Sequence, residues 1–449
     1  MLKLRKILAL FSGKLLIAAS RALGQQGTNL PGRLASFIYP PLLSELSRNI
    51  TKDCFMVTGT NGKTTTSNLA AAVIRAQGFS VVHNQAGANM LAGITTAFIQ
   101  NSDLLGLRTH DYALLETDEA NVAPLLQIIK PRYILVTNFF RDQLDRYGEL
   151  DTTVKLIISA VKGTGIELIL NADDPLQSHW SSLTGLRCLY YGFEHTAYDN
   201  LDSADSREGR YCMLCGHELE YSYYHYAQLG RFQCPHCGHH NQQLDYLGSE
   251  LSLENGVVFK IGDLQLESGF KGFYNAYNIL AAATLALEAG FDKDSIKRAI
   301  ASHQPAAGRM ETFIVGGKQV FLILVKNPTG FDQSLAMLTG DLQTKNIFMA
   351  LNDNAADGRD ISWIWDTQAE ILARSEEKIT GLICSGQRSG DMALRLKYAG
   401  LDTGKIVIEP DLRKAITQTL SLAGQVTYIL CTYTALFACR KILLRLRDR

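Results

Sequence analysis

The residues best suited to chemistry form one short run between an apolar, strand-like segment and a helix-like segment. The run reads Gly59, Thr60, Asn61, Gly62, Lys63, Thr64 and Thr65. Glycines at such a junction let the backbone turn tightly and bring its N–H groups close to phosphate oxygens. The helix start adds a partial positive charge, Lys63 a full charge, and the Thr64 hydroxyl a ligand for Mg²⁺. The run therefore predicts a phosphate-binding loop; the alternative is a glycine turn that happens to precede a lysine.

Four cysteines form a second group whose spacing predicts a metal site. Cys212 and Cys215 make one Cys-x-x-Cys pair, Cys234 and Cys237 make another, and each pair is followed by Gly-His. Four thiolates suit tetrahedral Zn²⁺ and leave no open position for water, so we expect a structural zinc, with an iron centre or redox dithiols as alternatives. Zinc can supply ~10–16 kcal/mol of folding energy to a small, loop-rich segment of this kind, about residues 199–248. This segment is rich in Tyr and His but poor in Lys and Arg, which favours support or protein contact over nucleic-acid binding.

Acidic residues follow a strand-like run in the first half of the chain. Glu116 comes directly after residues 112–115, and Asp118 and Glu119 stand close behind it. An acid at a strand end near a phosphate loop is placed to coordinate Mg²⁺, and we expect Glu116 to do so. Asp118 and Glu119 are competitors for this role, and a solvated acidic loop is the alternative interpretation.

Two polar loops in the second half also follow strand-like runs. One is Lys326-Asn327-Pro328-Thr329-Gly330, and the other covers residues 351–360. Trp363 and Trp365 come just after the second loop. These tryptophans are interpreted either as a buried aromatic anchor or as part of a partner-facing or catalytic loop.

The elements that must position these residues alternate between strand and helix. Strand-like runs are residues 54–57, 80–83, 112–115, 133–136 and 167–170 in the first half, and 320–325, 346–350, 381–384, 405–408 and 427–430 in the second. Alternation of this kind predicts an α/β fold with mostly parallel sheets covered by helices. Ligands bind at the carboxyl ends of the strands in such sheets, which is where the polar loops fall. Residues 251–253, 257–261 and 264–266 predict a return to the edge of the first sheet.

The length of 449 residues is too great for one ordinary core, and two or three domains are expected. We expect a helical and loop-rich lead-in over residues 1–50, a nucleotide-binding domain over 51–308 with the cysteine segment inserted, and a second α/β domain over 309–449. The 44 basic and 44 acidic residues balance, which argues against a generic nucleic-acid-binding surface. The five remaining cysteines lie in apolar contexts, so the usage is that of a reducing compartment.

The N-terminal segment alternates between basic and apolar residues. Lys14 splits its apolar run and Arg21 follows it, which disfavours a signal peptide. No apolar stretch reaches the length needed to span a membrane. We expect residues 1–23 to form a helix packed on the first domain, with a membrane-surface helix as the alternative. Residues 20–50 contain several glycines and prolines and are expected to be mostly loop.

The phosphate loop carries a resemblance to a known family. Only Thr60 and Asn61 lie between its two glycines, where the common pattern has four residues, and this short form is typical of Mur ligases and folylpolyglutamate synthases. With the acid after residue 115, the hinge-like Gly-Arg-Met-Glu at 308–311 and the second α/β domain, residues 54–449 resemble a Mur ligase that lacks the first domain. The cysteine insertion and the segment Asp-Gly-Arg-Asp-Ile-Ser-Trp are similar to those of the MurT family, the ligase-type subunits of lipid II isoglutaminyl synthase. The implied fold is a P-loop ATPase domain with an inserted Cys₄ zinc ribbon, followed by a Rossmann-like domain.

The resemblance implies roles for particular residues. Residues 59–65 would bind the ATP phosphates, and Thr64 and Glu116 would hold Mg²⁺. Asn275 matches an asparagine near the adenine, and Arg309 matches a hinge arginine that reaches the phosphates. Two positions depart from typical Mur ligases. Gln143 stands where a metal-binding histidine is usual, and Lys326 where an acid is usual, so a second metal and a pocket for an incoming amino acid are in doubt.

The implied activity is ATP-dependent amidation in peptidoglycan synthesis. The D-glutamate α-carboxyl of the lipid II stem peptide would be activated as an acyl phosphate and attacked by ammonia. No Cys-His pairing in this sequence suggests an internal glutaminase. The resemblance implies a GatD-like glutaminase as partner in a heterodimer, with an aspartate of this chain completing its Cys-His triad. We expect this residue to be Asp357, with Asp360 and Asp353 as alternatives.

The same resemblance implies a cytoplasmic enzyme that meets lipid II at the inner face of the membrane, with ATP, Mg²⁺ and Zn²⁺ as cofactors and no nucleic-acid partner. Two other functions remain open at this point. One is a Mur or folylpolyglutamate ligase that adds an amino acid, and the other is a non-catalytic zinc-ribbon module that binds nucleotide.

Overall fold

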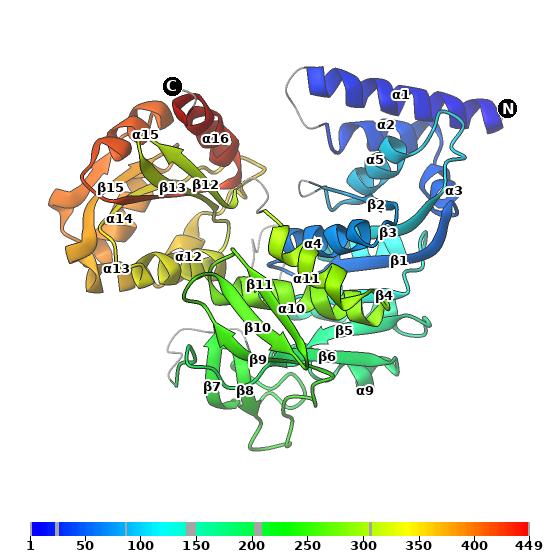
Figure 1. Ribbon diagram of the computed structural model, residues 1–449, viewed down its shortest axis with the longest axis horizontal. Coiled ribbons are helices and arrows are strands. Elements are labelled where there is room, and N and C mark those ends of the chain that lie inside the picture. The colour runs from blue at the N-terminus through cyan, green and yellow to red at the C-terminus, as the bar shows by residue number, and fades with distance from the viewer. Residues whose placement is uncertain are drawn as a thin grey trace. The chain divides into compact units, whose positions relative to one another are not determined.

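The computed structural model describes residues 2–22, 27–85, 88–140, 150–201, 209–304 and 308–447. They divide into two compact units, which are described separately (Figure 1). The first unit contains the described residues up to His303 apart from Phe140 and residues 270–272, which belong with the second unit. The second unit otherwise begins at Gln304.

The first unit is built on a nine-stranded sheet with the order β11-β10-β9-β6-β5-β4-β1-β3-β2. The strands are β1 (Ile50–Thr58), β2 (Val81–His83), β3 (His110–Glu116), β4 (Tyr133–Val136), β5 (Glu167–Asn171), β6 (Cys188–Phe193), β9 (Tyr246–Ser252), β10 (Val257–Ile261) and β11 (Leu264–Ser268). Pairing is parallel from β2 through β9 and antiparallel between β9, β10 and β11. The mostly parallel sheet and its antiparallel edge confirm the fold expected from the alternating pattern.

Strand β1 lies where the strand order reverses. The chain moves from β1 outward to β2 and back to β3 on one side, and then continues to β4 on the other side. Ligand-binding crevices in open α/β sheets form at such a switch point, at the carboxyl ends of the strands. The segment that follows β1 therefore occupies the position where the fold favours a bound nucleotide.

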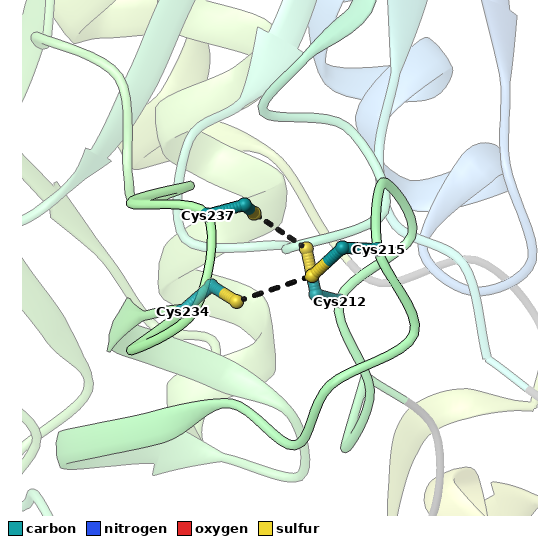
Figure 2. Close-up of side chains that lie close together, drawn as sticks. All are labelled: Cys212, Cys215, Cys234 and Cys237. Atoms are coloured by element: carbon teal, nitrogen blue, oxygen red, sulfur yellow. Dashed lines mark hydrogen bonds between the residues drawn. The ribbon is translucent and has the colours of Figure 1, made fainter.

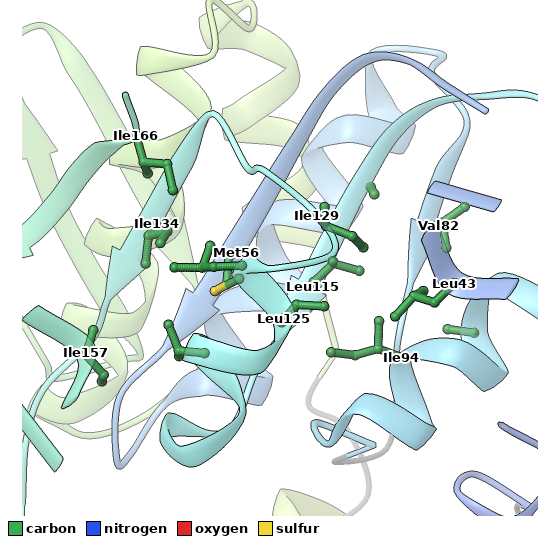
Figure 3. Close-up of a cluster of buried hydrophobic side chains, with 14 of the residues drawn as sticks. Leu43, Met56, Val82, Ile94, Leu115, Leu125, Ile129, Ile134, Ile157 and Ile166 are labelled. Atoms are coloured by element: carbon green, nitrogen blue, oxygen red, sulfur yellow. The ribbon is translucent and has the colours of Figure 1, made fainter. Parts of the chain in front are cut away.

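Helices cover both faces of this sheet. They are α1 (Leu2–Ala22), α2 (Leu30–Ile38), α3 (Leu42–Ser47), α4 (Lys63–Ala76), α5 (Leu91–Asn101), α6 (Glu119–Leu126), α8 (Leu150–Val161), α9 (Trp180–Thr184), α10 (Phe273–Glu288) and α11 (Lys293–Ser302). Figure 3 shows the core on one face, where Met56, Leu115 and Ile134 of the strands meet Leu125 of α6 and Ile157 of α8. Helices α4, α10 and α11 pack together on the other face.

The segment expected to be loop between residues 20 and 50 is largely helical in the described part, and that expectation was wrong. Pro31 lies in the first turn of α2, where a missing N–H costs nothing. Gly32 is required by packing, because a Cβ there would lie 1.9 Å from the Ala92 carbonyl oxygen of α5. In this segment proline begins a helix and glycine allows two helices to pack closely, so neither residue interrupts a helix.

The cysteine segment stands as an insertion between β6 and β9. Its described part contains the two-stranded sheet of β7 (Glu220–Tyr226) and β8 (Leu229–Gln233). A small core of Leu219 and Phe232 packs with the cysteines. This apolar core is small, so a metal ion held by the cysteines would add substantially to the stability of the segment.

The second unit has a six-stranded sheet with the order β12-β13-β17-β14-β15-β16. Its strands are β12 (Arg309–Val315), β13 (Lys318–Leu324), β14 (Lys345–Ala350), β15 (Ile379–Ser385), β16 (Ile406–Ile408) and β17 (Val426–Cys431). Only the β12–β13 pair is antiparallel. Segment 308–311, interpreted from the sequence as a hinge, lies near the start of the second unit, and Arg309 is the first residue of β12. Met310 packs into the core on one face of the sheet, and Phe313 and Val315 pack into the core on the other.

Helices cover both faces of the second sheet as well. They are α12 (Pro328–Gly340), η1 (Ser362–Asp366), α13 (Ile371–Arg374), η2 (Glu376–Lys378), α14 (Ser389–Tyr398), η3 (Thr403–Lys405), α15 (Leu412–Ser421) and α16 (Tyr433–Arg447). Apolar residues of α12, α13 and α14 form the core on one face, and those of α15 and α16 form it on the other. This doubly wound arrangement confirms the Rossmann-like second domain.

Candidate functional site

The predicted phosphate-binding loop, residues 59–65, connects β1 to α4, and both of its glycines are required by its geometry. Gly59 has φ +115° and Gly62 has φ +84°, values that other residues adopt only with strain. A Cβ on Gly59 would lie 2.4 Å from Thr137 Oγ1, and a Cβ on Gly62 would lie 2.0 Å from Asn278 Oδ1. The loop is therefore packed closely against Thr137, which follows β4, and Asn278 of α10.

Residues after β4 fix the loop through hydrogen bonds. The Thr60 N–H donates to the Asn138 carbonyl oxygen at 2.8 Å, and the Asn61 N–H donates to Asn138 Oδ1 at 2.9 Å. Thr137 Oγ1 donates to the Asn61 carbonyl oxygen at 2.7 Å. These bonds hold the loop in one conformation before any ligand arrives, which lowers the cost of binding.

Lys63 is the first residue of α4 and is buried. Its Nζ donates to the Gly59 carbonyl oxygen and, at 3.2 Å, to the Thr60 carbonyl oxygen. It also forms an ion pair of 3.1 Å with Glu119 Oε2, and both side chains are less than a tenth exposed. The ammonium is thus held over the loop by a buried carboxylate, a partner that the sequence suggested only as a competing metal ligand.

Glu116, at the end of β3, meets the same helix start. Thr64 Oγ1 donates to Glu116 Oε1 at 3.0 Å. The backbone of Glu116 is held on both sides by Asn84, which accepts from its N–H at 2.9 Å and donates to its carbonyl oxygen at 2.7 Å. A hydroxyl and a carboxylate oxygen beside a phosphate loop are a donor set that fits Mg²⁺. Asp118 instead caps α6, because its Oδ1 accepts from the Ala120 N–H at 3.2 Å.

Asn275 is connected to the loop by a hydrogen bond to Asn278, which also lies on α10. Asn278 Nδ2 donates to Asn275 Oδ1 at 3.1 Å, and Asn278 itself lies against Gly62. Both asparagines are buried at the start of α10. The structure therefore brings together residues 59–65, Glu116 and Asn275, all within the first unit.

The four cysteines also come together. Figure 2 shows Cys212 and Cys215 of one turn facing Cys234 and Cys237 of the other. The sulfur atoms all lie within 4.8 Å of one another, a spacing compatible with a tetrahedral zinc ion. The turns match, because the N–H groups of Gly216 and Gly238 donate to the carbonyl oxygens of Cys212 and Cys234.

His239 connects this cluster to the body of the first unit. Its Nδ1 lies 3.3 Å from Cys212 Sγ, and its Nε2 lies 2.5 Å from Ser178 Oγ. The ring is buried. If the cluster holds a metal ion, a histidine in this position would orient the Cys212 thiolate and adjust its charge, as outer partners of metal ligands commonly do. In the sequence this residue is marked only weakly, by its position two residues after the second Cys-x-x-Cys pair.

The three candidate aspartates of the second unit differ in environment. Asp357 is buried, and its carboxylate accepts from the Thr434 N–H at 2.7 Å and from Thr434 Oγ1 at 2.5 Å. Asp353 is half-buried and pairs with Arg388 at 2.8 Å. Asp360 is exposed and caps Ser362 N–H at 2.8 Å. Thr434, at the start of α16, gave no signal in the sequence as a partner of this loop.

Two other residues with predicted roles belong to the other unit. Arg309 begins β12 and Lys326 follows β13, so both belong to the second unit. Gln143 lies outside the described residues.

The two tryptophans were interpreted either as a buried aromatic anchor or as part of a partner-facing or catalytic loop, and their environments differ. Trp363 is half-buried and packs edge-on against Phe331 of α12, with ring centroids 6.0 Å apart. Trp365 is 48% exposed and lies against Tyr398, which is 70% exposed. One tryptophan anchors the segment, and the other contributes to an exposed aromatic surface.

Comparisons with known proteins agree with this architecture. Residues 57–286 match the family model of the Mur ligase middle domain, and residues 324–436 match that of the MurT ligase C-terminal domain. The chain is 37% identical over 434 residues to the lipid II isoglutaminyl synthase (glutamine-hydrolysing) subunit MurT of Staphylococcus aureus, covering 96% of each chain. It is 33% identical over 446 residues to the corresponding subunit of Streptococcus pneumoniae, covering 98% of each chain.

Solved structures share the fold. A pseudomurein peptide ligase type C from Methanothermus fervidus aligns with a TM-score of 0.67 and 21% identity, over 88% of this chain and 79% of that one. A MurF ligase from Thermotoga maritima in complex with ADP aligns with a TM-score of 0.62 and 14% identity, over 92% of this chain and 84% of that one.

Proposed function

Because this chain belongs to the MurT family of Mur-type ligases, we propose that it is the ligase subunit of a lipid II isoglutaminyl synthase. It uses ATP to convert the α-carboxyl of the stem-peptide D-glutamate into an amide, giving D-isoglutamine. The observation that carries this proposal is that Lys63, Thr64 and Glu116 meet at one loop, in a chain that is similar to a MurT subunit over 96% of its length.

The first step is activation of the carboxylate. A carboxylate oxygen attacks the γ-phosphorus of ATP, the bond to the β-phosphate oxygen breaks, and an acyl phosphate and ADP form. Loop N–H groups, the start of α4 and Lys63 stabilise the charge that develops on the transferring group. Mg²⁺, held by Thr64 and Glu116, would neutralise phosphate charge when bound. Lys63 exchanges Glu119 for phosphate oxygens in this step.

Amide formation follows. Ammonia attacks the acyl carbon, the bond between that carbon and the phosphate oxygen breaks, and inorganic phosphate leaves with the electron pair and takes up the proton that the nitrogen loses. A ligase that uses ammonia as its nitrogen source needs no pocket for an incoming amino acid. This agrees with Lys326 standing where typical Mur ligases have an acidic residue. The Cys₄ cluster is assigned a structural zinc, because four thiolates leave no position for a reacting group.

Ammonia comes from a glutaminase partner of the GatD type, with which this chain forms a heterodimer. We assign Asp357 to the partner's Cys-His pair as its orienting acid. Its carboxylate is already held by two bonds from Thr434, and an acid that fixes a histidine ring must itself be fixed. The exposed Trp365 and Tyr398 of the same unit are suited to the protein contact this requires. The lipid-linked substrate sets the place of action at the inner face of the membrane.

A nitrogen-source assay tests the reaction. The chain with a soluble, short-chain lipid II analogue and ATP is expected to give the amide with ammonium chloride alone, and with glutamine only when the glutaminase is present. The Lys63→Ala and Glu116→Ala variants are expected to lose both activities. Product formation that requires an amino acid, or that survives both substitutions, contradicts the proposal.

The role of Asp357 is tested by the same assay. Asp357→Asn is expected to abolish turnover with glutamine and to retain turnover with ammonia. Asp353→Asn and Asp360→Asn serve as matched controls from the same loop. If Asp357→Asn loses both activities while remaining folded, this residue belongs to the ligase site instead.

A further inference from the structure

Helices α1 and α2 leave an apolar surface uncovered in the first unit. Along α1, Leu4, Leu8, Phe11 and Leu15 are 72%, 55%, 54% and 58% exposed. Their spacing of four, three and four residues places them on one side of the helix. On α2, Leu30 and Phe37 are 60% and 83% exposed. Large apolar side chains gathered in this way mark a surface that binds something.

The opposite side of α1 packs against the core of the first unit. Ala9, Leu10 and Ile17 are buried in the core of the first unit. Gly13 permits close contact with α5, because a Cβ there would lie 3.1 Å from the Ile99 side chain. Lys14 Nζ donates to the Ser102 carbonyl oxygen at 2.6 Å. The exposed stripe is therefore a fixed outer face of a folded domain, and Figure 1 shows α1 as its outermost helix, with α2 beneath it.

The basic residues around this surface indicate a negatively charged partner. The first 44 residues contain six basic residues, Lys3, Arg5, Lys6, Lys14, Arg21 and Arg33, and no acidic residue. Lys6 and Lys14 bond to the protein, whereas Lys3, Arg5, Arg21 and Arg33 have exposed side chains. The whole chain is neutral, with 44 basic and 44 acidic residues, so this excess is local.

We propose that α1 and α2 form a docking surface for an anionic lipid bilayer, with the apolar stripe entering the boundary between headgroups and acyl chains. Apolar side chains on one helix face with basic residues beside them are the features of helices that lie in a membrane interface. None of the described helices is both long enough and apolar enough to cross a membrane. Docking concentrates the enzyme where a lipid-linked substrate is found; in that respect the inference builds on the proposed function, but its test does not depend on the reaction.

The test is co-sedimentation of the full chain with vesicles. Vesicles containing phosphatidylglycerol are expected to bind the protein and vesicles of phosphatidylcholine alone are not, and added salt is expected to weaken binding. The double variant Phe11→Ser/Leu15→Ser is expected to lower the partition coefficient about a hundredfold, roughly tenfold per side chain. The double variant Arg5→Glu/Arg21→Glu is expected to remove the preference for anionic lipid.

Matched controls come from apolar residues outside α1 and α2. Leu156 and Ile314 are 54% and 57% exposed, and their serine variants are expected to bind vesicles as the unchanged chain does. All variants are expected to retain turnover of the soluble substrate analogue, which separates loss of docking from loss of fold or function. The inference is overturned if the chain does not sediment with anionic vesicles, or if Phe11→Ser/Leu15→Ser binds them equally. It is also overturned if that variant changes the oligomeric state in sedimentation velocity instead, since the surface would then join protein to protein.

Discussion

Adding one methyl group at Gly62 tests how the phosphate loop is held. A Cβ there would lie 2.0 Å from Asn278 Oδ1, a distance no real contact permits. Asn278 would have to move, which breaks its 3.1 Å bond to Asn275 inside a buried cluster. Leaving such groups unpaired costs about 1–3 kcal/mol. A non-glycine residue at positive φ adds ~1–2 kcal/mol of backbone strain, so Gly62→Ala is expected to lower unfolding free energy by about 2–5 kcal/mol.

Gly78 provides the matched control at the other end of the same helix, α4. Its φ is also +84°, but a Cβ there would have nothing within 4 Å. Gly78→Ala should therefore cost only the strain, about 1–2 kcal/mol. Urea unfolding measures both variants, and titration with a fluorescent ATP analogue measures the loop directly. We expect Gly62→Ala to weaken binding tenfold or more and Gly78→Ala to leave it unchanged.

A double variant separates the contact from the strain. Adding Asn278→Ala to Gly62→Ala is expected to restore about 1–3 kcal/mol relative to the sum of the single effects, because the colliding atom is gone. Equal losses of stability in Gly62→Ala and Gly78→Ala, together with unchanged nucleotide binding, would refute the reasoning that α10 braces the loop.

Three further predictions concern other parts of the chain. Burial lowers the pKa of His83 to about 4 from an ordinary 6.5. The imidazole of His83 therefore binds a proton less readily in the folded state than in the unfolded chain. Stability should fall by about 3 kcal/mol between pH 6.5 and pH 4, and His83→Gln should flatten this part of the stability curve. Removing zinc with a chelator, or substituting Cys234→Ser, is expected to open residues 209–241 to proteolysis while ATP binding persists, as measured by metal content and limited digestion. Arg395 donates to the carbonyl oxygens of Ile364 and Thr367 at 2.9 and 2.6 Å. Arg395→Met should lower the unfolding free energy, measured with urea, by about 2–4 kcal/mol. Arg395→Lys should be almost as destabilising, because a lysine ammonium cannot reproduce the planar, multiple-donor geometry of the guanidinium.

The sequence predicts the parts of the site whose cues are local. The strand before Gly59, the glycines themselves and the helix after Lys63 are neighbours in the chain, so pattern and propensity agree on them. The two Cys-x-x-Cys pairs are likewise local, and the structure brings their four sulfur atoms together.

Some contacts between distant residues could not be predicted. Nothing near Glu119 indicates that it pairs with Lys63 rather than with a metal, because the distance between them depends on how β1 and β3 align. Strand β6 was missed because both of its faces are buried, and a short apolar run without alternation does not distinguish strand from helix. Residues 30–47 were misjudged because glycine and proline serve close helix packing there as readily as they serve turns.

The position of Asn278 also has a consequence for how the protein is made. The nucleotide loop is translated early, but the side chain that packs against Gly62 comes more than two hundred residues later, after the whole cysteine segment. During synthesis from the N-terminus, β1 and α4 can pair with their neighbours long before α10 emerges. A ribosome-bound chain that ends before residue 278 should therefore contain the loop sequence without its final shape. The capacity to bind nucleotide would be acquired late in translation, after the turns of the two Cys-x-x-Cys pairs have been synthesised.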